Sequence, residues 1–172
     1  MSFPFDDFIA AVPNFPKEGI LFRDITPLLA SPTAFKACLE AMEVQAKSFK
    51  PTHIVGIESR GFIFGVPLAQ ALNLPFIPAR KPGKLPREVH RVSYQLEYGE
   101  DALCIHKDDI PSHAKVLIVD DLLATGGTAS ACGDLVVTAG AEIAGYLFAI
   151  ELADLNGAGR LNHGPHHSLI TY

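Results

Sequence analysis

The chain of 172 residues has few cysteines and no long uninterrupted apolar run. Its cysteines, Cys38, Cys104 and Cys132, are odd in number and far apart, which is typical of reduced cytosolic thiols and argues against a disulfide framework. The longest uncharged segment, residues 61–79, is interrupted by three prolines, so we expect no membrane span.

Positive charge is also scarce. The net charge of −5 argues against a nucleic-acid-binding protein on bulk electrostatics. The first ten residues contain two aspartates and no basic residue, so we expect no signal peptide and a cytoplasmic location. With 48% apolar and 19% charged residues, the composition is that of a globular protein long enough to bury a core. We therefore expect a single domain over residues 1–172.

The most informative segment, residues 115–128, reads Lys-Val-Leu-Ile-Val-Asp-Asp-Leu-Leu-Ala-Thr-Gly-Gly-Thr. Its apolar run 116–119 predicts a short strand buried on both faces of a parallel sheet. Two carboxylates, Asp120 and Asp121, follow where we expect that strand to end. A small-residue turn then leads into a predicted helix over residues 129–137, an order that places a polar turn at a helix N-terminus.

This turn, residues 124–128, has the composition of an anion site. A helix N-terminus presents unpaired N–H groups and the positive end of the helix dipole, which favour a phosphate. Gly126 and Gly127 allow the backbone to approach an anion closely, and Thr125 and Thr128 add hydroxyl donors. No lysine follows the glycines, so this is not a Walker loop, and a single phosphate beside a ribose diol fits better than a triphosphate. The alternative is an ordinary buried strand followed by an acidic loop and a glycine turn.

The rest of the chain repeats this alternation of buried strands and helices. A predicted strand at residues 53–57 ends at Glu58-Ser59-Arg60 and is followed by a predicted helix over 62–72. Such an order predicts an α/β domain with a central, mostly parallel sheet of about five strands. The other expected elements are an amphipathic helical piece at 3–12, a short extended run at 20–22, a helix from Ser31-Pro32 to Lys47, strands at 75–79 and 141–152, a hairpin from 93–99 and 102–106, and an edge strand at 168–172.

A cationic segment, residues 80–91, follows the strand at 75–79. It carries five cationic residues and one glutamate, and its prolines and glycine predict a loop. A charge run of this kind is usually a solvated loop. Its place after a central strand also makes it a candidate lid that closes over an anionic ligand.

Residues 116–128 resemble the phosphoribosyl-pyrophosphate (PRPP) signature of type I phosphoribosyltransferases. The filling Leu122-Leu123-Ala124 resembles the adenine phosphoribosyltransferase branch in particular, and the resemblance runs from about Phe15 through the strand after the signature. It implies a type I phosphoribosyltransferase-like fold, in which helices flank the sheet and residues 1–30 form a small hood over the carboxyl edge of the sheet. Family members are commonly dimers, so a homodimer is expected, with no nucleic-acid or membrane partner.

The resemblance implies a purine salvage enzyme that transfers the 5-phosphoribosyl group from PRPP to adenine and gives AMP and pyrophosphate. Glu97 is the implied catalytic residue, and Mg²⁺ the implied cofactor. The metal would be held mainly through the substrate, with Asp120 and Asp121 orienting the ribose directly or through the metal's waters. The implied binding residues are Asp120, Asp121, Ala124, Thr125, Gly126, Gly127 and Thr128 for the PRPP 5′-phosphate and ribose, Ser59, Arg60, Arg80, Lys81 and Lys84 for pyrophosphate, and Leu21, Phe22, Arg23 and Leu122 for adenine.

Simpler interpretations exist for individual residues. Phe22 could be a core aromatic, Arg60 a solvated surface charge and Glu97 an exposed strand glutamate. At the level of function, a phosphoribosyltransferase for another base would share the PRPP site. A regulator of the same fold that binds PRPP and recognises nucleic acid is a second alternative, although an added DNA-binding segment or basic surface is expected of such proteins.

Overall fold

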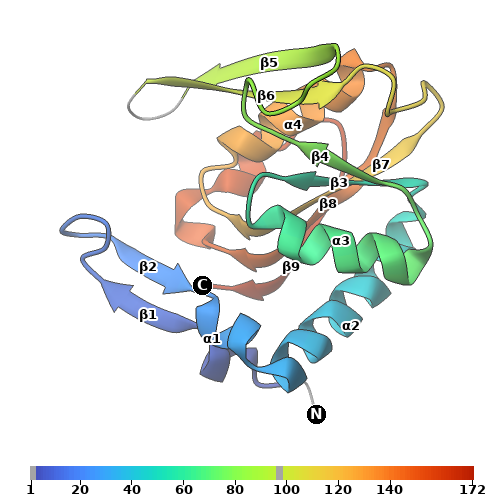
Figure 1. The fold of residues 1–172 in the computed structure, drawn as a ribbon. Helices are drawn as coiled ribbons and strands as arrows, with labels where there is room; N and C mark the ends of the chain where they lie inside the picture. Colours follow the sequence, from blue (N-terminus) through green and yellow to red (C-terminus); the bar gives the residue numbers. More distant parts are fainter. Residues whose placement is uncertain (1–2, 96–98) are drawn as a thin grey trace. The chain divides into compact units, whose positions relative to one another are not determined.

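The computed structural model describes residues 3–95 and 99–172 and divides the chain into two compact units (Figure 1). The smaller unit ends at Ala41 and the larger runs from Met42 to Tyr172, so the boundary falls within helix α2 (Pro32–Phe49). The interpretation of residues 1–172 as a single domain, with residues 1–30 as its hood, stays a prediction. No helix in the described part of the chain is both long and apolar enough to cross a bilayer.

The smaller unit is built around a hairpin. It contains a 3₁₀ helix η1 (Phe5–Phe8), antiparallel strands β1 (Ala10–Pro13) and β2 (Leu21–Asp24), helix α1 (Thr26–Ala30) and the start of α2. The expected helical piece over residues 3–12 is wrong beyond Phe8, because residues from Ala10 onward pair with β2. The expected start of α2 is confirmed: the Ser31 hydroxyl accepts a hydrogen bond from the Ala34 N–H at 3.3 Å.

The larger unit contains a five-stranded sheet in the order β4-β3-β7-β8-β9, in which every neighbouring pair is parallel. This confirms the expected parallel sheet. The apolar run at 116–119 lies in its central strand and is fully buried, as predicted. Pro78 lies on an edge strand, where the ladder tolerates a missing donor. The strands are β3 (His53–Ile57), β4 (Phe76–Ala79), β7 (Lys115–Leu123), β8 (Glu142–Glu151) and β9 (His166–Thr171).

Strand β7 is longer than the sequence predicts. It was expected to end before Asp120, but it continues to Leu123, whose partner in β8 is Glu151. The neighbouring strand offers backbone partners along this whole stretch, and these ladder bonds outweigh the low strand preference of aspartate. Both acids therefore lie on a strand, which fixes their backbone more firmly than a loop would.

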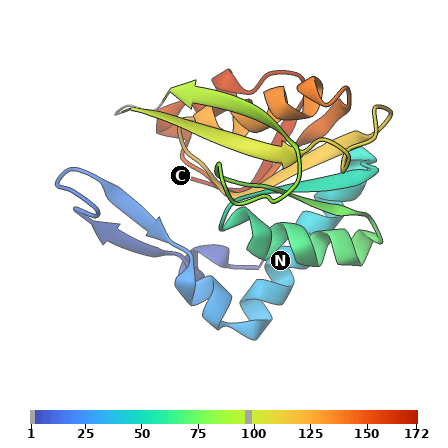
Figure 2. The same ribbon diagram turned by 45° about the horizontal axis from the view of Figure 1, so that its top comes forward.

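Helices cover the two faces of this sheet. Helix α3 (Gly61–Leu72) packs on one face and α4 (Gly127–Thr138) on the other (Figures 1 and 2). The chain leaves β3 through α3 toward one edge of the sheet and leaves β7 through α4 toward the other. The sheet order therefore reverses between β3 and β7, and in open α/β sheets ligands bind beyond the carboxyl ends of the strands at this switch point.

A second hairpin, of β5 (Val89–Gln95) and β6 (Glu100–His106), packs against α4 (Figure 2). The pairing confirms the expected hairpin, but β5 begins at Val89, so the last three residues of the cationic segment 80–91 belong to a strand and not to a loop. The main apolar core joins the sheet, α4 and the inward face of β6. Two short 3₁₀ turns, η2 (Ala153–Leu155) and η3 (Gly157–Arg160), follow β8.

Candidate active site

A cavity of about 340 Å³ lies at the switch point of the larger unit. The segments that follow β3 and the end of β7 form most of its wall, and the turn before α4 closes one side. Of the residues predicted to bind substrate, Ser59, Arg60, Lys81, Asp120, Asp121, Leu122, Ala124, Thr125, Gly126, Gly127 and Thr128 line it. The lining is completed by four residues that had no predicted binding role, Ile57, Glu58, Leu123 and Ala129.

The turn before α4 contains one residue in the left-handed conformation. Gly126 is the N-cap residue of α4 and has φ +79°, a left-handed conformation that side chains disfavour. The first residues of α4, Gly127, Thr128 and Ala129, line the cavity at the positive end of the helix dipole. The turn is not packed shut by side chains, and Thr125 and Thr128 remain partly exposed within it.

Gly157 in η3 supports this turn from behind. A Cβ atom added to Gly157 would lie 2.1 Å from the Ala124 carbonyl oxygen, and one added to Gly126 would lie 2.3 Å from the Gly157 oxygen. The two backbones touch at a distance that only glycine permits. The sequence interpretation missed Gly157, because it lies about thirty residues from the signature in what reads as a variable connection.

The two acids at the end of β7 have different surroundings. Asp121 is 3% exposed and its Oδ2 lies 2.9 Å from Arg60 Nε, whereas Asp120 is partly exposed and its Oδ1 accepts a hydrogen bond from the Asp121 N–H at 2.9 Å. Burial, followed by the neighbouring charge of Asp121, raises the pKa of Asp120 well above its ordinary value. Burial also raises the pKa of Asp121, and the Arg60 guanidinium opposes this rise.

The start of α3 lies against the same acids. A Cβ atom on Gly61 would be 2.7 Å from the Val119 carbonyl oxygen and 3.0 Å from Asp120 Oδ1. Arg60, expected to contact phosphate, lines the cavity but also pairs with Asp121. The loop after β3 and the start of α3 are therefore in direct contact with the acidic end of β7.

The loop after β3 begins with a cis peptide bond, between Glu58 and Ser59. The Glu58 carboxylate accepts a hydrogen bond from Arg80 Nη2 and another from the Lys81 N–H, both at 2.9 Å. The bond from Arg80 is the main reason that the pKa of Glu58 lies below its ordinary value. Glu58 thus joins this loop to the beginning of the cationic segment.

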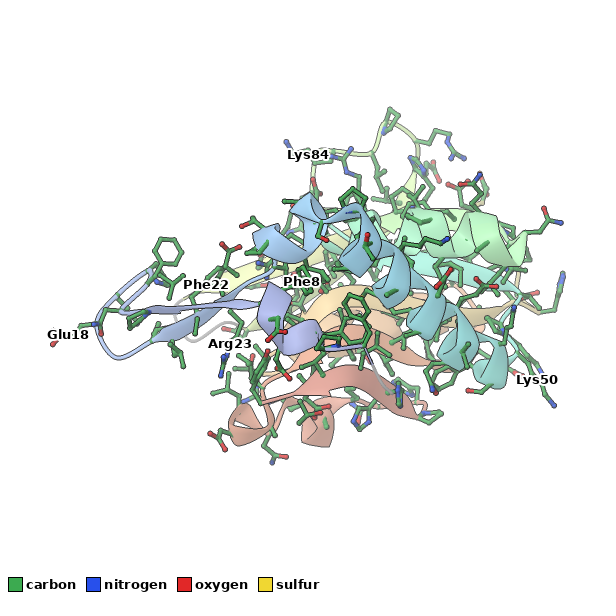
Figure 3. All side chains as sticks on the ribbon, turned by 90° about the horizontal axis from the view of Figure 1, so that it is seen from below. Phe8, Glu18, Phe22, Arg23, Lys50 and Lys84 are labelled. Atoms are coloured by element: carbon green, nitrogen blue, oxygen red, sulfur yellow. The ribbon has the colours of Figure 1, made fainter. Side chains whose placement is uncertain are left out.

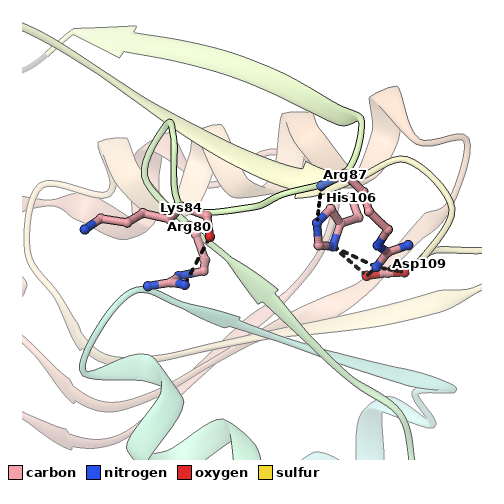
Figure 4. Close-up of polar contacts among 5 residues, drawn as sticks. All are labelled: Arg80, Lys84, Arg87, His106 and Asp109. Carbon is pink, nitrogen blue, oxygen red and sulfur yellow. Dashed lines mark hydrogen bonds and ion pairs between the residues drawn. The ribbon is translucent and has the colours of Figure 1, made fainter.

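Of the three cations predicted to bind pyrophosphate on that segment, only Lys81 lines the cavity in the described structure. The Arg80 guanidinium donates to the Lys84 carbonyl oxygen at 3.3 Å through Nη1 (Figure 4), and the Lys84 side chain is exposed. The phosphate contacts of Arg80 and Lys84 stay predictions.

The far end of the same loop is held by a buried histidine. The Arg87 N–H donates to His106 Nε2 at 3.4 Å, while Asp109 accepts two bonds from Arg87 Nη2 at 2.8 Å and lies 3.0 Å from His106 Nδ1 (Figure 4). These contacts fix the point where the loop enters β5.

The predicted adenine residues fall in both units. Leu21, Phe22 and Arg23 lie on β2 of the smaller unit, and Leu122 lines the cavity of the larger one. Leu21 is 48% exposed, and the Phe22 ring packs edge-on against Phe15 with centroids 5.1 Å apart. Phe22 and Arg23 point to opposite faces of the strand (Figure 3). Their joint role in an adenine site stays a prediction.

Glu97, predicted to be the catalytic residue, lies outside the described residues, so its placement is not tested.

Comparison with known proteins agrees with this geometry. A phosphoribosyl transferase domain model matches residues 25–160. Adenine phosphoribosyltransferase of Francisella philomiragia is 58% identical over 168 residues, 96% of each chain, and that of Synechocystis sp. is 54% identical over 95% of this chain and 96% of the relative.

Solved structures give the same result. The adenine phosphoribosyltransferase of Thermoanaerobacter pseudethanolicus superposes with a TM-score of 0.94 at 44% identity over 98% of each chain. That of Saccharomyces cerevisiae, solved in complex with an imino-altritol bisphosphate and adenine, gives 0.92 at 43% identity over 96% of each chain. The expected type I phosphoribosyltransferase fold is thereby confirmed. The chain belongs to the adenine phosphoribosyltransferase family of pentosyl-transferring enzymes.

Proposed function

We propose that this enzyme transfers the 5-phosphoribosyl group of PRPP to adenine in purine salvage, releasing pyrophosphate and AMP. The observation that carries the proposal is the cavity at the switch point, where an open glycine turn at a helix N-terminus lies beside two carboxylates. A phosphate on the turn leaves the ribose of the same molecule next to the acids.

The turn at residues 124–128 would bind the 5′-phosphate through its backbone N–H groups and the hydroxyls of Thr125 and Thr128. Asp120 and Asp121 would accept hydrogen bonds from the ribose hydroxyls. The pair also places negative charge near the anomeric carbon, where positive charge develops if the bond to pyrophosphate breaks ahead of bond formation to adenine. Such a dissociative displacement suits this site.

Pyrophosphate would leave along the cavity wall formed by Lys81 and the loop after β3, which contains the cis peptide bond. Ser59 and Arg60 line this wall, and the loop that carries Arg80 and Lys84 would act as a lid that brings further positive charge and excludes water. Stabilising the departing charge is the contribution that these cations make to the rate.

Phe22 would lie against one face of adenine, with the backbone at Leu21 and Arg23 meeting its edge. A polar edge of this kind disfavours a 6-oxopurine, because the wrong donor and acceptor pattern leaves buried groups unpaired at about 1–3 kcal/mol each. The adenine-bound yeast relative supports this assignment of the base.

The donor set suits magnesium. Mg²⁺ prefers oxygen ligands and is commonly held by one or two carboxylates together with substrate phosphates, which is what Asp120 and Asp121 offer beside a bound PRPP. When bound, the metal would neutralise charge on the leaving pyrophosphate.

Replacing Glu97 by glutamine is expected to lower kcat by about 100-fold, within the usual range for loss of a general acid–base group, while leaving the Kd for PRPP within about twofold. The carboxylate would take or hold a proton of the purine imidazole ring as the other ring nitrogen attacks ribose. Steady-state kinetics and calorimetric PRPP binding separate the two effects. An unchanged kcat would remove Glu97 from the mechanism.

One assay tests the proposed function. Pyrophosphate release from PRPP should require adenine, and hypoxanthine, guanine and xanthine should give kcat/KM values at least about 100-fold lower. Faster turnover with another base would make this a sister enzyme. No turnover with any purine, together with tight RNA binding, would favour the regulatory alternative.

Two further expectations accompany this function. A homodimer is expected from the resemblance, and light scattering of the purified chain would measure its mass. A cytoplasmic location is supported by the three cysteines, which are all buried and unbridged.

A further inference from the structure

Lys81 is held through both its backbone and its side chain. Its backbone N–H donates to Glu58, and the preceding residue, Arg80, exchanges both backbone hydrogen bonds with Cys104 of β6, at 2.9 and 2.7 Å. The backbone of residues 80 and 81 is thus bonded to the loop after β3 and to β6 before the chain enters the loop at residues 82–88. Lys81 therefore starts from a fixed backbone position.

The Lys81 side chain is fixed as well. Its Nζ forms an ion pair with Asp101 Oδ2 and donates to the Tyr94 hydroxyl at 3.1 Å, and the same hydroxyl lies 3.3 Å from Asp101 Oδ2. Asp101 is itself oriented, because its other oxygen accepts a hydrogen bond from the Ala102 N–H at 2.7 Å. The three side chains form a closed cluster between the cavity wall and the hairpin β5–β6.

The geometry leaves Lys81 able to bind a ligand. An ammonium group has three N–H donors, and Asp101 and Tyr94 take two of them within the part of the chain that the structure describes. Lys81 lines the cavity, so the third N–H can meet an anion there. Burial alone would lower the pKa of Lys81, but the bonds to Asp101 and Tyr94 outweigh it and raise the pKa, so the group stays charged.

We propose that Asp101 and Tyr94 are positioning residues that hold the Lys81 ammonium in place for pyrophosphate. The inference rests on the proposed function, since it assigns this wall of the cavity to the leaving group. Neither residue contacts the reacting atoms; each acts through Lys81. In the sequence, Tyr94 precedes and Asp101 follows the segment 96–98, which contains the predicted catalytic residue Glu97.

Asp101→Asn is the test, because asparagine keeps the oxygen that accepts from Ala102 but loses the charge that orients Lys81. Titration calorimetry with inorganic pyrophosphate is expected to show a Kd about tenfold higher than that of the wild-type chain, as expected when a charge-assisted contact loses its orientation. The KM for PRPP should rise in parallel, whereas the KM for adenine and the Kd for AMP should stay unchanged. Tyr94→Phe should give the same pattern with a smaller effect.

Two controls make the result specific. Asp108→Asn removes an equal charge from an exposed position just after β6 and should leave pyrophosphate binding unchanged. In a Lys81→Met background, adding Asp101→Asn should have no further effect, because the second change acts only through the first. Thermal unfolding would confirm that each variant is folded.

Unchanged or tighter pyrophosphate binding by Asp101→Asn would overturn the inference, since Asp101 would then be a bystander or a competitor for Lys81. An additive double variant would overturn it as well. The proposed function fails separately: a wild-type chain that binds pyrophosphate in the Asp101-dependent way but does not consume PRPP with adenine would support this inference and refute that function.

Discussion

Gly157→Ala is expected to lower kcat/KM for PRPP by at least about 100-fold, the scale on which a displacement of about 1 Å reduces catalysis. The added methyl group would lie 2.1 Å from the Ala124 carbonyl oxygen and 2.9 Å from the Gly126 nitrogen, so the turn at residues 124–128 must move. Gly157 itself does not line the cavity. The loss would therefore arise from a displaced backbone and should fall mainly on the KM for PRPP.

Gly159→Ala is the matched control, because it lies in the same 3₁₀ turn. The atoms nearest to its added methyl group would be those of the exposed Asn156 side chain, the first at 3.2 Å, and this side chain can shift without moving the turn at 124–128. This variant should keep wild-type kinetics. If Gly157→Ala also kept them while folding normally, the turn at 124–128 could not be the phosphate site.

Asp120→Asn is expected to stabilise the fold while reducing activity. Near neutral pH, the desolvation of the Asp120 carboxylate and its repulsion by Asp121 are costs that asparagine removes, while asparagine can still accept the bond from the Asp121 N–H. We expect a gain of about 1 kcal/mol, or about 2–4 °C in Tm for a chain of this size. We expect kcat/KM for PRPP to fall by at least about 100-fold, because the ribose loses one of its two carboxylates.

The pH dependence of this stabilisation has a definite sign. The pKa of Asp120 is higher in the folded than in the unfolded chain, so the unfolded chain loses its proton first as pH rises. The contribution of Asp120 to wild-type stability therefore falls between about pH 4, the ordinary aspartate value, and the raised folded pKa. The advantage of Asp120→Asn should be near zero at pH 4 and should grow toward pH 7.

Unfolding by heat or urea at several pH values would measure this advantage. Asp154→Asn, which removes the same charge from an exposed position in η2, serves as control and should show no such growth. A variant of Asp120 that is less stable than the wild type at pH 7 would show that the acid pair does not carry the electrostatic cost described for it.

The residues of the PRPP signature could be predicted because their structure is local. A buried strand, two acids, a glycine turn and a helix follow one another directly, and the chain order alone places the turn at a helix N-terminus. The same holds for the loop at 58–60 after β3. The parallel sheet then brings the two segments together, because adjacent parallel strands end at the same edge.

The rest depended on contacts between distant residues. The contact of Gly157 with the turn at 124–128 joins segments about thirty residues apart, and the Lys81–Asp101 ion pair joins segments about twenty residues apart. Residue spacing within one element gives no signal for either contact. The residues at 10–13 have a spacing that also fits a helix, and only their pairing with β2 makes them a strand. Likewise, β7 extends past its acids because β8 lies beside it.

A titration of the isotope-labelled chain with ribose 5-phosphate, followed by amide NMR, tests most directly where the sugar phosphate binds. Bound phosphate at a helix N-terminus should shift the backbone amide signals of residues 125–128 in a saturable way, and Gly157→Ala should weaken this response. Saturable shifts confined to other parts of the chain, with the signals of 125–128 unchanged, would contradict the account.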